Sequence, residues 1–481
     1  MTKVSNILII IFEIIIYVSV VFCQVFPVNT HILNGERNKL INIVYLSEGY
    51  TKAEMEKFRQ DVDKTVQNFF NCPPFSEYKE HFNTFSIEVP SNESGTSHPG
   101  TAPDCPRDYP VFIKDTYFNS TFDYAGIHRL LYARNVSRIY SVLQDNLPDW
   151  DAVFIIVNHT WYGGSGGEFA AFSMDPSSSE IAIHEFGHSF ADLADEYEIG
   201  NLPAREAPNT TSETRRSFIK WKSWINDSTP VPTPEDDMYS HVIGLFEGAV
   251  YHSIGWYRPK LNCKMRSLNI DFCEVCQEQI IKTIHKSSGT IKSFYPDVYD
   301  ISIFGKRNIR LKVEPFSSQF LDYWFQWYID GNLEENANAP SILFSSQLLG
   351  NGKHEAKAIV LHQTNSVRND PNNFLSDSVK WTINISGTDS SIYTFYPYPN
   401  PFSESATFNF GLPYESHVLI KIYDILGQEI TILANSEKEA GIYTAKWKPS
   451  ISSGVYLYRI EIYSKTNNST YNKTGKIILI R

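Results

Sequence analysis

The hydrophobic pattern of this 481-residue chain changes near residue 296, and that change limits the folds that the chain can adopt. Upstream, residues 153–157 form a continuous apolar run of strand length, and apolar residues recur at helical spacing over 52–70. Downstream, segments such as 308–313, 323–329 and 379–385 alternate apolar and polar residues, which is typical of strands with one buried face. We therefore predict a mixed α/β region followed by an all-β region.

Length adds a second limit, because 481 residues exceed what one hydrophobic core supports. We predict a multidomain protein that begins with a mixed α/β domain over residues 24–295. Two all-β modules follow, over 296–388 and 391–481, and their short strands and frequent turns are typical of immunoglobulin-like sandwiches.

The first residues have the composition of a targeting segment. Residues 7–22 are nearly all apolar. A membrane anchor needs about 20 apolar residues in a row, and Glu13 breaks this run. Cys23 can serve as the small residue before a cleavage at Gln24. We predict that residues 1–23 are a cleaved signal peptide, with an uncleaved anchor as the alternative.

Charge and hydropathy exclude several classes of partner. The formal net charge of −12 argues against nucleic acid or an anionic membrane surface as the main partner. Outside the first residues there is no second apolar run of membrane length. We therefore expect an exported protein without a stable membrane span.

Six cysteines less Cys23 leave five in the mature chain, and an odd number outside the cell requires at least one free thiol. Cys273 and Cys276 form a CxxC pair, which lacks the second pair that a zinc ribbon needs. Since Cys263 lies ten residues before Cys273, we predict a local disulfide in this loop.

The sequence His184-Glu185-Phe186-Gly187-His188 carries the strongest chemical signal. His184 and His188 are one helical turn apart, so both imidazoles project from the same face of a helix. That spacing can place two ring nitrogens about 2.0–2.1 Å from one Zn²⁺ ion. Glu185 lies about 100° round the helix, where it can act on a metal-bound water rather than bind the metal. We predict that Glu185 takes the proton of that water and later passes it to the leaving amine.

The neighbouring residues favour a helix over this motif. Ser177 and Glu180 have the spacing of a capping box, which predicts a helix that begins near Ser178. Two histidines on an ordinary helix are the alternative. The residues expected on the apolar side, away from the histidines, are Ile183, Phe186, Phe190 and Leu193.

A third metal ligand must come from beyond the helix. On a continued helix Asp195 would lie about 10 Å along the axis from His188, so it reaches the metal only if the chain folds back. Many zinc peptidases have a glycine for that turn; here Ala191 stands at its position, and Asp192 tolerates a left-handed conformation. We predict Asp195 as the third ligand, with Glu196 and the distant Glu247 as alternatives.

Three further elements fit such a site, each with a plain structural alternative. The glycine-rich turn at 163–167 could leave its backbone open to an extended substrate, or form a surface loop. Met265 could pack beneath the metal or belong to an ordinary core, and Tyr197 could stabilise an oxyanion.

Five segments in this order resemble the IgA peptidase family of zinc metallopeptidases: 46–50, 162–167, 184–197, 244–249 and 257–263. The resemblance implies a zincin-like domain with zinc-dependent endopeptidase activity and His184, Glu185 and His188 in the roles given above. It does not imply immunoglobulin A as the substrate.

The last ninety residues resemble the C-terminal sorting domain of the type IX secretion system, found in Bacteroidetes. The segments that carry the resemblance are 398–402, 423–427, 454–456 and the basic and apolar ending 476–481. The resemblance implies recognition by the export machinery at the outer membrane, and an ordinary immunoglobulin-like module is the alternative. The protein is then secreted or attached to the cell surface.

The function that we predict is a secreted, zinc-dependent endopeptidase that hydrolyses peptide bonds of protein or peptide substrates. One alternative is a cell-surface binding protein, similar to an adhesin, with a vestigial metal site; the intact Glu185 argues against it. A metal-dependent hydrolase of another amide is the second alternative.

Overall fold

The computed structural model divides the chain into two compact units, which are described separately. The first contains the described residues up to Lys292, together with Pro315–Tyr323 and Leu361–Asp377; the second contains Ser293–Glu314, Trp324–Val360 and the residues from Ser378 on. The predicted signal peptide, 1–23, lies outside the described residues. The structure describes residues 25–199, 203–305, 307–317, 321–386, 393–394, 396–464 and 468–480.

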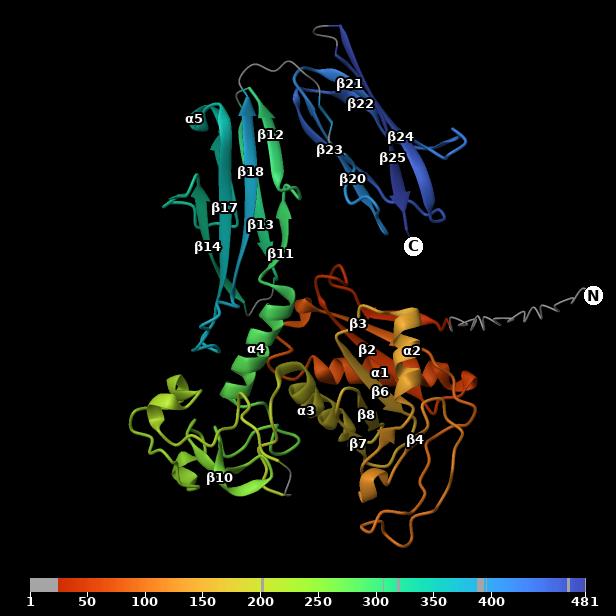
Figure 1. Ribbon diagram of the computed structural model, residues 1–481, viewed down its shortest axis with the longest axis vertical. Helices are drawn as coiled ribbons and strands as arrows, with labels where there is room; N and C mark the ends of the chain where they lie inside the picture. The colour runs from red at the N-terminus through yellow and green to blue at the C-terminus, as the bar shows by residue number, and fades with distance from the viewer. Residues whose placement is uncertain are drawn as a thin grey trace, which may run out of the picture. The chain divides into compact units, whose positions relative to one another are not determined.

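A six-stranded sheet forms the centre of the first unit (Figure 1). Its strand order is β1 (Val28–Ile32), β3 (Phe82–Ile87), β2 (Ile41–Glu48), β6 (Ala152–Val157), β8 (Ala170–Ser173) and β7 (Gly164–Ser165). The four inner strands are parallel, and β1 and β7 run antiparallel to their neighbours. Every residue of β2 and β6 is buried; β6 is a continuous apolar run, whereas β2 also buries Asn42, Ser47 and Glu48.

Helices cover both faces of this sheet because successive strand residues point to opposite sides. Ile43 and Tyr45 of β2 belong to the core that α1 (Met55–Phe69), α3 (Ser178–Ala191) and α4 (Glu274–Ser288) complete. Val44 and Leu46 belong to a second core, completed by α2 (Val136–Asn146). The predicted strand at 153–157 and the helix over 52–70 are confirmed as β6 and α1, with a 3₁₀ turn at Lys52–Glu54 ahead of α1.

Two small pairs of strands complete the first unit. β4 (Ser120–Thr121) pairs with β5 (Tyr132–Ala133), and β9 (Phe246–Ala249) pairs with β10 (His252–Arg258). The described residues 88–119 and 203–245, which precede these two pairs, contain no α-helix and no strand, apart from three 3₁₀ turns in the second stretch.

The second unit consists of strands, apart from the single turn α5 (Ser346–Leu349) among its described residues. The strands predicted at 308–313, 323–329 and 379–385 are found as β13, β14 and β18. A three-stranded sheet has the order β11 (Ile291–Tyr295), β13 (Asn308–Pro315), β16 (Ser341–Ser345). A five-stranded sheet has the order β12 (Asp300–Phe304), β18 (Ser376–Ser386), β17 (Gly352–Gln363), β14 (Asp322–Ile329), β15 (Asn332–Leu333).

The end of the chain forms two further sheets around a core of their own. One has the order β19 (Tyr393–Thr394), β20 (Ala406–Leu412), β23 (Gly441–Trp447). The other has the order β22 (Glu429–Lys438), β21 (Ser416–Tyr423), β24 (Gly454–Ser464), β25 (Ser469–Leu479). Alternate residues of these strands, such as Phe408, Ile420 and Ile460, are buried in that core.

Among the residues that the structure describes, no helix has the length and hydropathy needed to cross a membrane.

Candidate metal centre

The helix that carries the two histidines begins where the sequence predicts, but by another route. α3 starts at Ser178, yet Ser177 has helical dihedral angles and its side chain makes no capping hydrogen bond, so the predicted capping box is wrong. Glu180, the other half of that motif, instead forms an ion pair with the buried Lys264, 84 residues away. Asp175 takes over at the helix start, where its side chain accepts a hydrogen bond from the amide of Ser177.

The apolar side of α3 fixes the helix against the sheet as predicted. Phe186 is fully buried and stacks on Phe190, with ring centroids 4.7 Å apart. Its ring also contacts Phe69 of α1 edge-on. Ile183 belongs to the same core, and Leu193 follows just after the helix. The opposite side of α3, which holds the histidines, is therefore held in one orientation.

The end of α3 folds the chain back onto the histidines. Asp192 adopts the left-handed conformation predicted for it, with φ 55° and ψ 28°. Its amide donates to the carbonyl of His188, and the amide of Leu193 donates to that of Gly187, at 3.1 and 3.2 Å. Aspartate takes this conformation at lower cost than most residues, so the turn forms without the usual glycine.

This turn brings Asp195 to both imidazoles. Oδ1 of Asp195 lies 3.1 Å from Nε2 of His184 and 3.2 Å from Nε2 of His188. The two Nε2 atoms are themselves 3.1 Å apart. Three ligand atoms from His184, His188 and Asp195 thus surround one point.

Backbone carbonyls fix which ring nitrogens face that point. Nδ1 of His184 lies 2.9 Å from the carbonyl oxygen of Lys264, and Nδ1 of His188 lies 2.7 Å from that of Leu193. Because a carbonyl oxygen only accepts, each Nδ1 carries a proton, and Nε2 of each neutral ring presents a lone pair. Two lone pairs and a carboxylate oxygen repel one another unless they share a cation, so this donor set fits a metal ion.

Tyr251 completes the support of the carboxylate. Its hydroxyl donates to Oδ2 of Asp195, which leaves Oδ1 toward the histidines. The backbone holds Tyr251 there: φ is 69°, and the amides of Val250 and Tyr251 donate to the carbonyls of Asp195 and Tyr197. Burial raises the pKa of Asp195, but the two histidine rings beside it outweigh that effect and hold the pKa well below its usual range.

Glu185 lies under the glycine-rich segment 163–167, which includes β7. A Cβ atom on Gly166 would lie only 1.6 Å from Oε2 of Glu185, so no other residue fits there with the carboxylate in place. Burial is the largest influence on Glu185 and raises its pKa, although His184 and His188 act against it. The carboxylate of Glu185, which the sequence predicts as the base, thus lies directly against the backbone of Gly166.

Comparison with known proteins assigns the family. A family model described as IgA Peptidase M64 matches residues 32–239 and 235–284, which is more than half of the chain. The chain belongs to the IgA peptidase M64 family. A second model, described as a secretion system C-terminal sorting domain, matches residues 397–479 and indicates type IX export to the cell surface or the medium. No curated protein matches the chain.

Solved structures add only weak likenesses to this M64 peptidase. CopC from Methylosinus trichosporium OB3b is 11% identical over 18% of this chain and 93% of its own, with a TM-score of 0.16. The fibronectin(III)-like modules of CbhA from Clostridium thermocellum are 12% identical over 39% and 93%, with a TM-score of 0.17. A β-glucuronidase from Parabacteroides merdae is 8% identical over 46% of this chain and 28% of its own, with a TM-score of 0.21.

Met265 of this M64 peptidase belongs to the hydrophobic core that packs against α3, which is the ordinary core position among the two arrangements predicted for it. The residue is fully buried, and its Sδ atom would lie 2.9 Å from a Cβ on Gly187. Gly187 stands between the two histidines in the sequence, so the missing side chain lets Met265 reach the helix at that turn. Tyr197 lies nearby with its ring against Tyr251.

The two alternative ligands lie elsewhere. Glu247 is exposed and accepts a hydrogen bond from the amide of Gly255, outside the group formed by His184, His188 and Asp195. Glu196 turns away into the protein, where its Oε1 accepts from Asn209 at 2.9 Å and lies 3.3 Å from Sγ of Cys276. Burial raises the pKa of Glu196 well above its usual range.

Glu196 shares its surroundings with the three cysteines of the predicted disulfide loop. The sulfur atoms of Cys263 and Cys276 are 3.6 Å apart, far from the bond length of about 2.05 Å. All five described cysteines are free thiols, so the predicted local disulfide is wrong. The spacing alone misled because Cys263, Cys273 and Cys276 converge as a trio on one buried point rather than as a pair.

Proposed function

We propose that this M64 peptidase is an exported, zinc-dependent endopeptidase that hydrolyses peptide bonds in protein substrates. His184, His188 and Asp195 hold the metal, and Glu185 is the general base. The observation that carries the proposal is the convergence of two Nε2 lone pairs and one carboxylate oxygen within 3.2 Å of one another.

Two nitrogens and one oxygen from three side chains are the ligand set of many catalytic zinc sites, which leave a fourth position for water or substrate. A zinc ion held by these three residues would supply Lewis acidity, which lowers the pKa of a bound water towards about 7 and polarises a carbonyl group. The hydrogen bonds from Nδ1 to the carbonyls of Lys264 and Leu193 orient both rings for this role.

Glu185 follows His184 directly but lies beyond the ligand group, with its carboxylate against Gly166. We assign it the proton transfers: it takes a proton from the attacking water and returns it to the leaving amine. Tyr251 keeps Asp195 in place through its hydroxyl, and Tyr197 is the candidate donor to the oxyanion.

In this proposal the chain has four parts, and the first and last of them serve export. Residues 1–23 act as the signal peptide, and 24–295 form the zincin-like catalytic domain. The all-β regions over 296–388 and 391–481 are immunoglobulin-like modules, the second of which the type IX machinery recognises.

The test compares Glu185→Ala with the wild type on an unfolded protein substrate, with and without a zinc chelator. We expect both the substitution and the chelator to reduce cleavage, the substitution by about 10²- to 10⁴-fold. Glu247→Ala is the matched control, since that exposed carboxylate lies outside the ligand group, and it should keep wild-type activity.

Undiminished cleavage by Glu185→Ala would contradict the assigned base. Bound zinc without any cleavage by the wild type would instead favour a cell-surface binding protein.

A further inference from the structure

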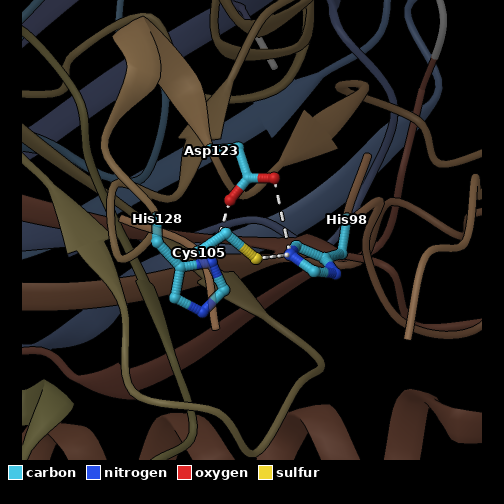
Figure 2. Close-up of side chains that lie close together, drawn as sticks. All are labelled: His98, Cys105, Asp123 and His128. Atoms are coloured by element: carbon cyan, nitrogen blue, oxygen red, sulfur yellow. Dashed lines mark hydrogen bonds and ion pairs between the residues drawn. The ribbon is translucent and has the colours of Figure 1, made fainter. Parts of the chain in front are cut away.

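A second group of donor side chains lies outside the metal centre, in the irregular stretch before α2. His98, Cys105, Asp123 and His128 each offer one ligand atom, and all four atoms lie within 4.8 Å of one another (Figure 2). None of these residues has a part in the proposed peptide hydrolysis.

Backbone contacts orient His98 toward this group as they orient the histidines of α3. Its Nδ1 lies 2.6 Å from the carbonyl oxygen of Pro110, so Nδ1 carries the proton and Nε2 presents a lone pair. That Nε2 lies 3.4 Å from Oδ2 of Asp123 and 3.4 Å from Sγ of Cys105 (Figure 2). A pair of backbone hydrogen bonds with Phe112, in an antiparallel bridge, fixes the backbone of His98 as well.

Asp123 brings a charge into this group that lacks a permanent partner. Its side chain is fully buried, and Oδ1 lies 2.9 Å from Nδ1 of His128. Among the described residues, its only ion-pair partners are His98 and His128, and neither is permanently charged. A buried carboxylate without a fixed cation costs free energy, so the site favours a bound cation.

We propose that His98, Cys105, Asp123 and His128 bind a second zinc ion. Two imidazoles, one thiolate and one carboxylate give four ligands of the types that tetrahedral zinc takes in closed, structural sites. Protonated histidines alone would account for Asp123. Cys105 adds a fourth donor atom, because its sulfur lies 3.4 Å from Nε2 of His98, where a thiol donates to the ring nitrogen and a thiolate would share a cation with it.

The site would hold together a stretch that has little regular structure to hold it. Between β3 and α2, the described elements are the two-residue strands β4 and β5 and one 3₁₀ turn. Asp123 follows β4, and His128 lies just before the residues that pair with the glycine-rich segment. A metal bound by four residues would cross-link this stretch, as structural zinc does in small domains.

This cross-link would also fix one wall of the catalytic centre. The amide of Gly164 donates to the carbonyl of Arg129, and the amide of Leu131 donates to that of Gly164. Gly166, two residues further on, lies against the carboxylate of Glu185. The second zinc therefore sets the position of the glycine-rich segment over the proposed base.

The test is the zinc content of the full mature chain, measured by mass spectrometry after dialysis. We expect Cys105→Ser and His128→Gln each to lose one zinc per chain relative to the wild type. Cys72→Ser removes a buried thiol outside the group and should keep the wild-type content. His188→Ala should lose a different zinc, so the double variant with Cys105→Ser should lose two. If Cys105→Ser loses a zinc and His188→Ala loses none, this site is upheld and the proposed function is contradicted.

A measurement on the wild type keeps the proposal testable if the variants fail to fold. Cys105 is partly exposed, so a free thiol there should react with an alkylating reagent. We expect the zinc-loaded protein to protect Cys105 and a chelator to expose it, as mapped by peptide mass spectrometry. Equal alkylation with and without the chelator, or wild-type zinc content in folded Cys105→Ser, would overturn the proposal.

Discussion

The two donor groups of the first unit are built on opposite kinds of backbone. His184 and His188 extend from one buried helix, and a single turn at Asp192 adds Asp195. His98, Cys105, Asp123 and His128 come from four places in an irregular stretch. Yet in both groups a backbone carbonyl holds Nδ1 of a histidine and turns Nε2 toward the other donor atoms, at His184 and His188 in one group and at His98 in the other. Preorganised histidines therefore depend on local hydrogen bonds and not on secondary structure.

The glycine-rich segment lies between the two donor groups: Gly164 bonds to the stretch that carries His128, and Gly166 lies against Glu185. A change at Gly166 should have the largest effect on activity. In Gly166→Ala the new methyl group would meet the carboxylate of Glu185, which must then move. Misplacement of a catalytic group by about 1 Å can cost 10²-fold in rate. We expect kcat/KM to fall by about that factor while zinc content stays unchanged.

Gly35→Ala is the control, because its added methyl group meets only the side chain of Leu40. Wild-type kcat/KM in Gly166→Ala would show that the glycine-rich segment does not constrain the base.

The hydrogen bond from Tyr251 to Asp195 distinguishes the helix-borne group, and its removal should weaken zinc binding there. Loss of such an outer contact typically reduces metal affinity 10- to 100-fold. We expect Tyr251→Phe to show this loss in a competition titration with a chelator. Tyr257→Phe serves as the control, since that hydroxyl only approaches Glu247 at 3.5 Å. Equal affinities of the two variants would exclude Tyr251 from the support of the metal.

A buried histidine pair, His285 and His362, lies outside both donor groups. Nε2 of His285 lies 3.0 Å from Nδ1 of His362, and among the described residues no third ligand atom joins them as in the other groups. Burial lowers the pKa of His285 to about 3 and that of His362 to about 4. Below about pH 6.5 the unfolded chain therefore binds more protons than the folded chain.

The free energy of unfolding should accordingly be highest above about pH 6.5 and fall by up to about 6 kcal/mol as the pH drops to 4. Urea unfolding at several pH values measures this slope. We expect His362→Gln to flatten this slope. An unchanged slope in His362→Gln would show that the pair is not the source.

The smallest effect is expected at the start of α3. Because Ser177 makes no capping hydrogen bond, Ser177→Ala should change the free energy of unfolding by less than about 0.5 kcal/mol. A true N-cap serine would cost about 1 kcal/mol. A loss of that size on thermal or urea unfolding would restore the capping box.

Periodicity explains what could be predicted from the sequence. The pair His184 and His188 and the apolar side of α3 repeat at helical spacing, and β6 is marked by a continuous apolar run of strand length. The turn at Asp192 could be predicted because few residues tolerate a left-handed conformation. These features depend on residues close together in the chain.

Contacts between distant residues could not be predicted in this way. Tyr251 reaches Asp195 across 56 residues from an unusual backbone conformation, and no motif marks it. Glu180 has the spacing of a capping box with Ser177, but its carboxylate forms an ion pair with Lys264 instead. The group around Asp123 has no repeat at all, because irregular backbone brings its members together.

The central claim is that zinc binds where His184, His188 and Asp195 converge. Anomalous diffraction at the zinc absorption edge, from crystals of the zinc-loaded mature protein, tests it most directly. We predict a peak bonded to both Nε2 atoms and to the carboxylate of Asp195, with a second peak among His98, Cys105, Asp123 and His128. A map with no peak beside His184 and His188 would contradict the account.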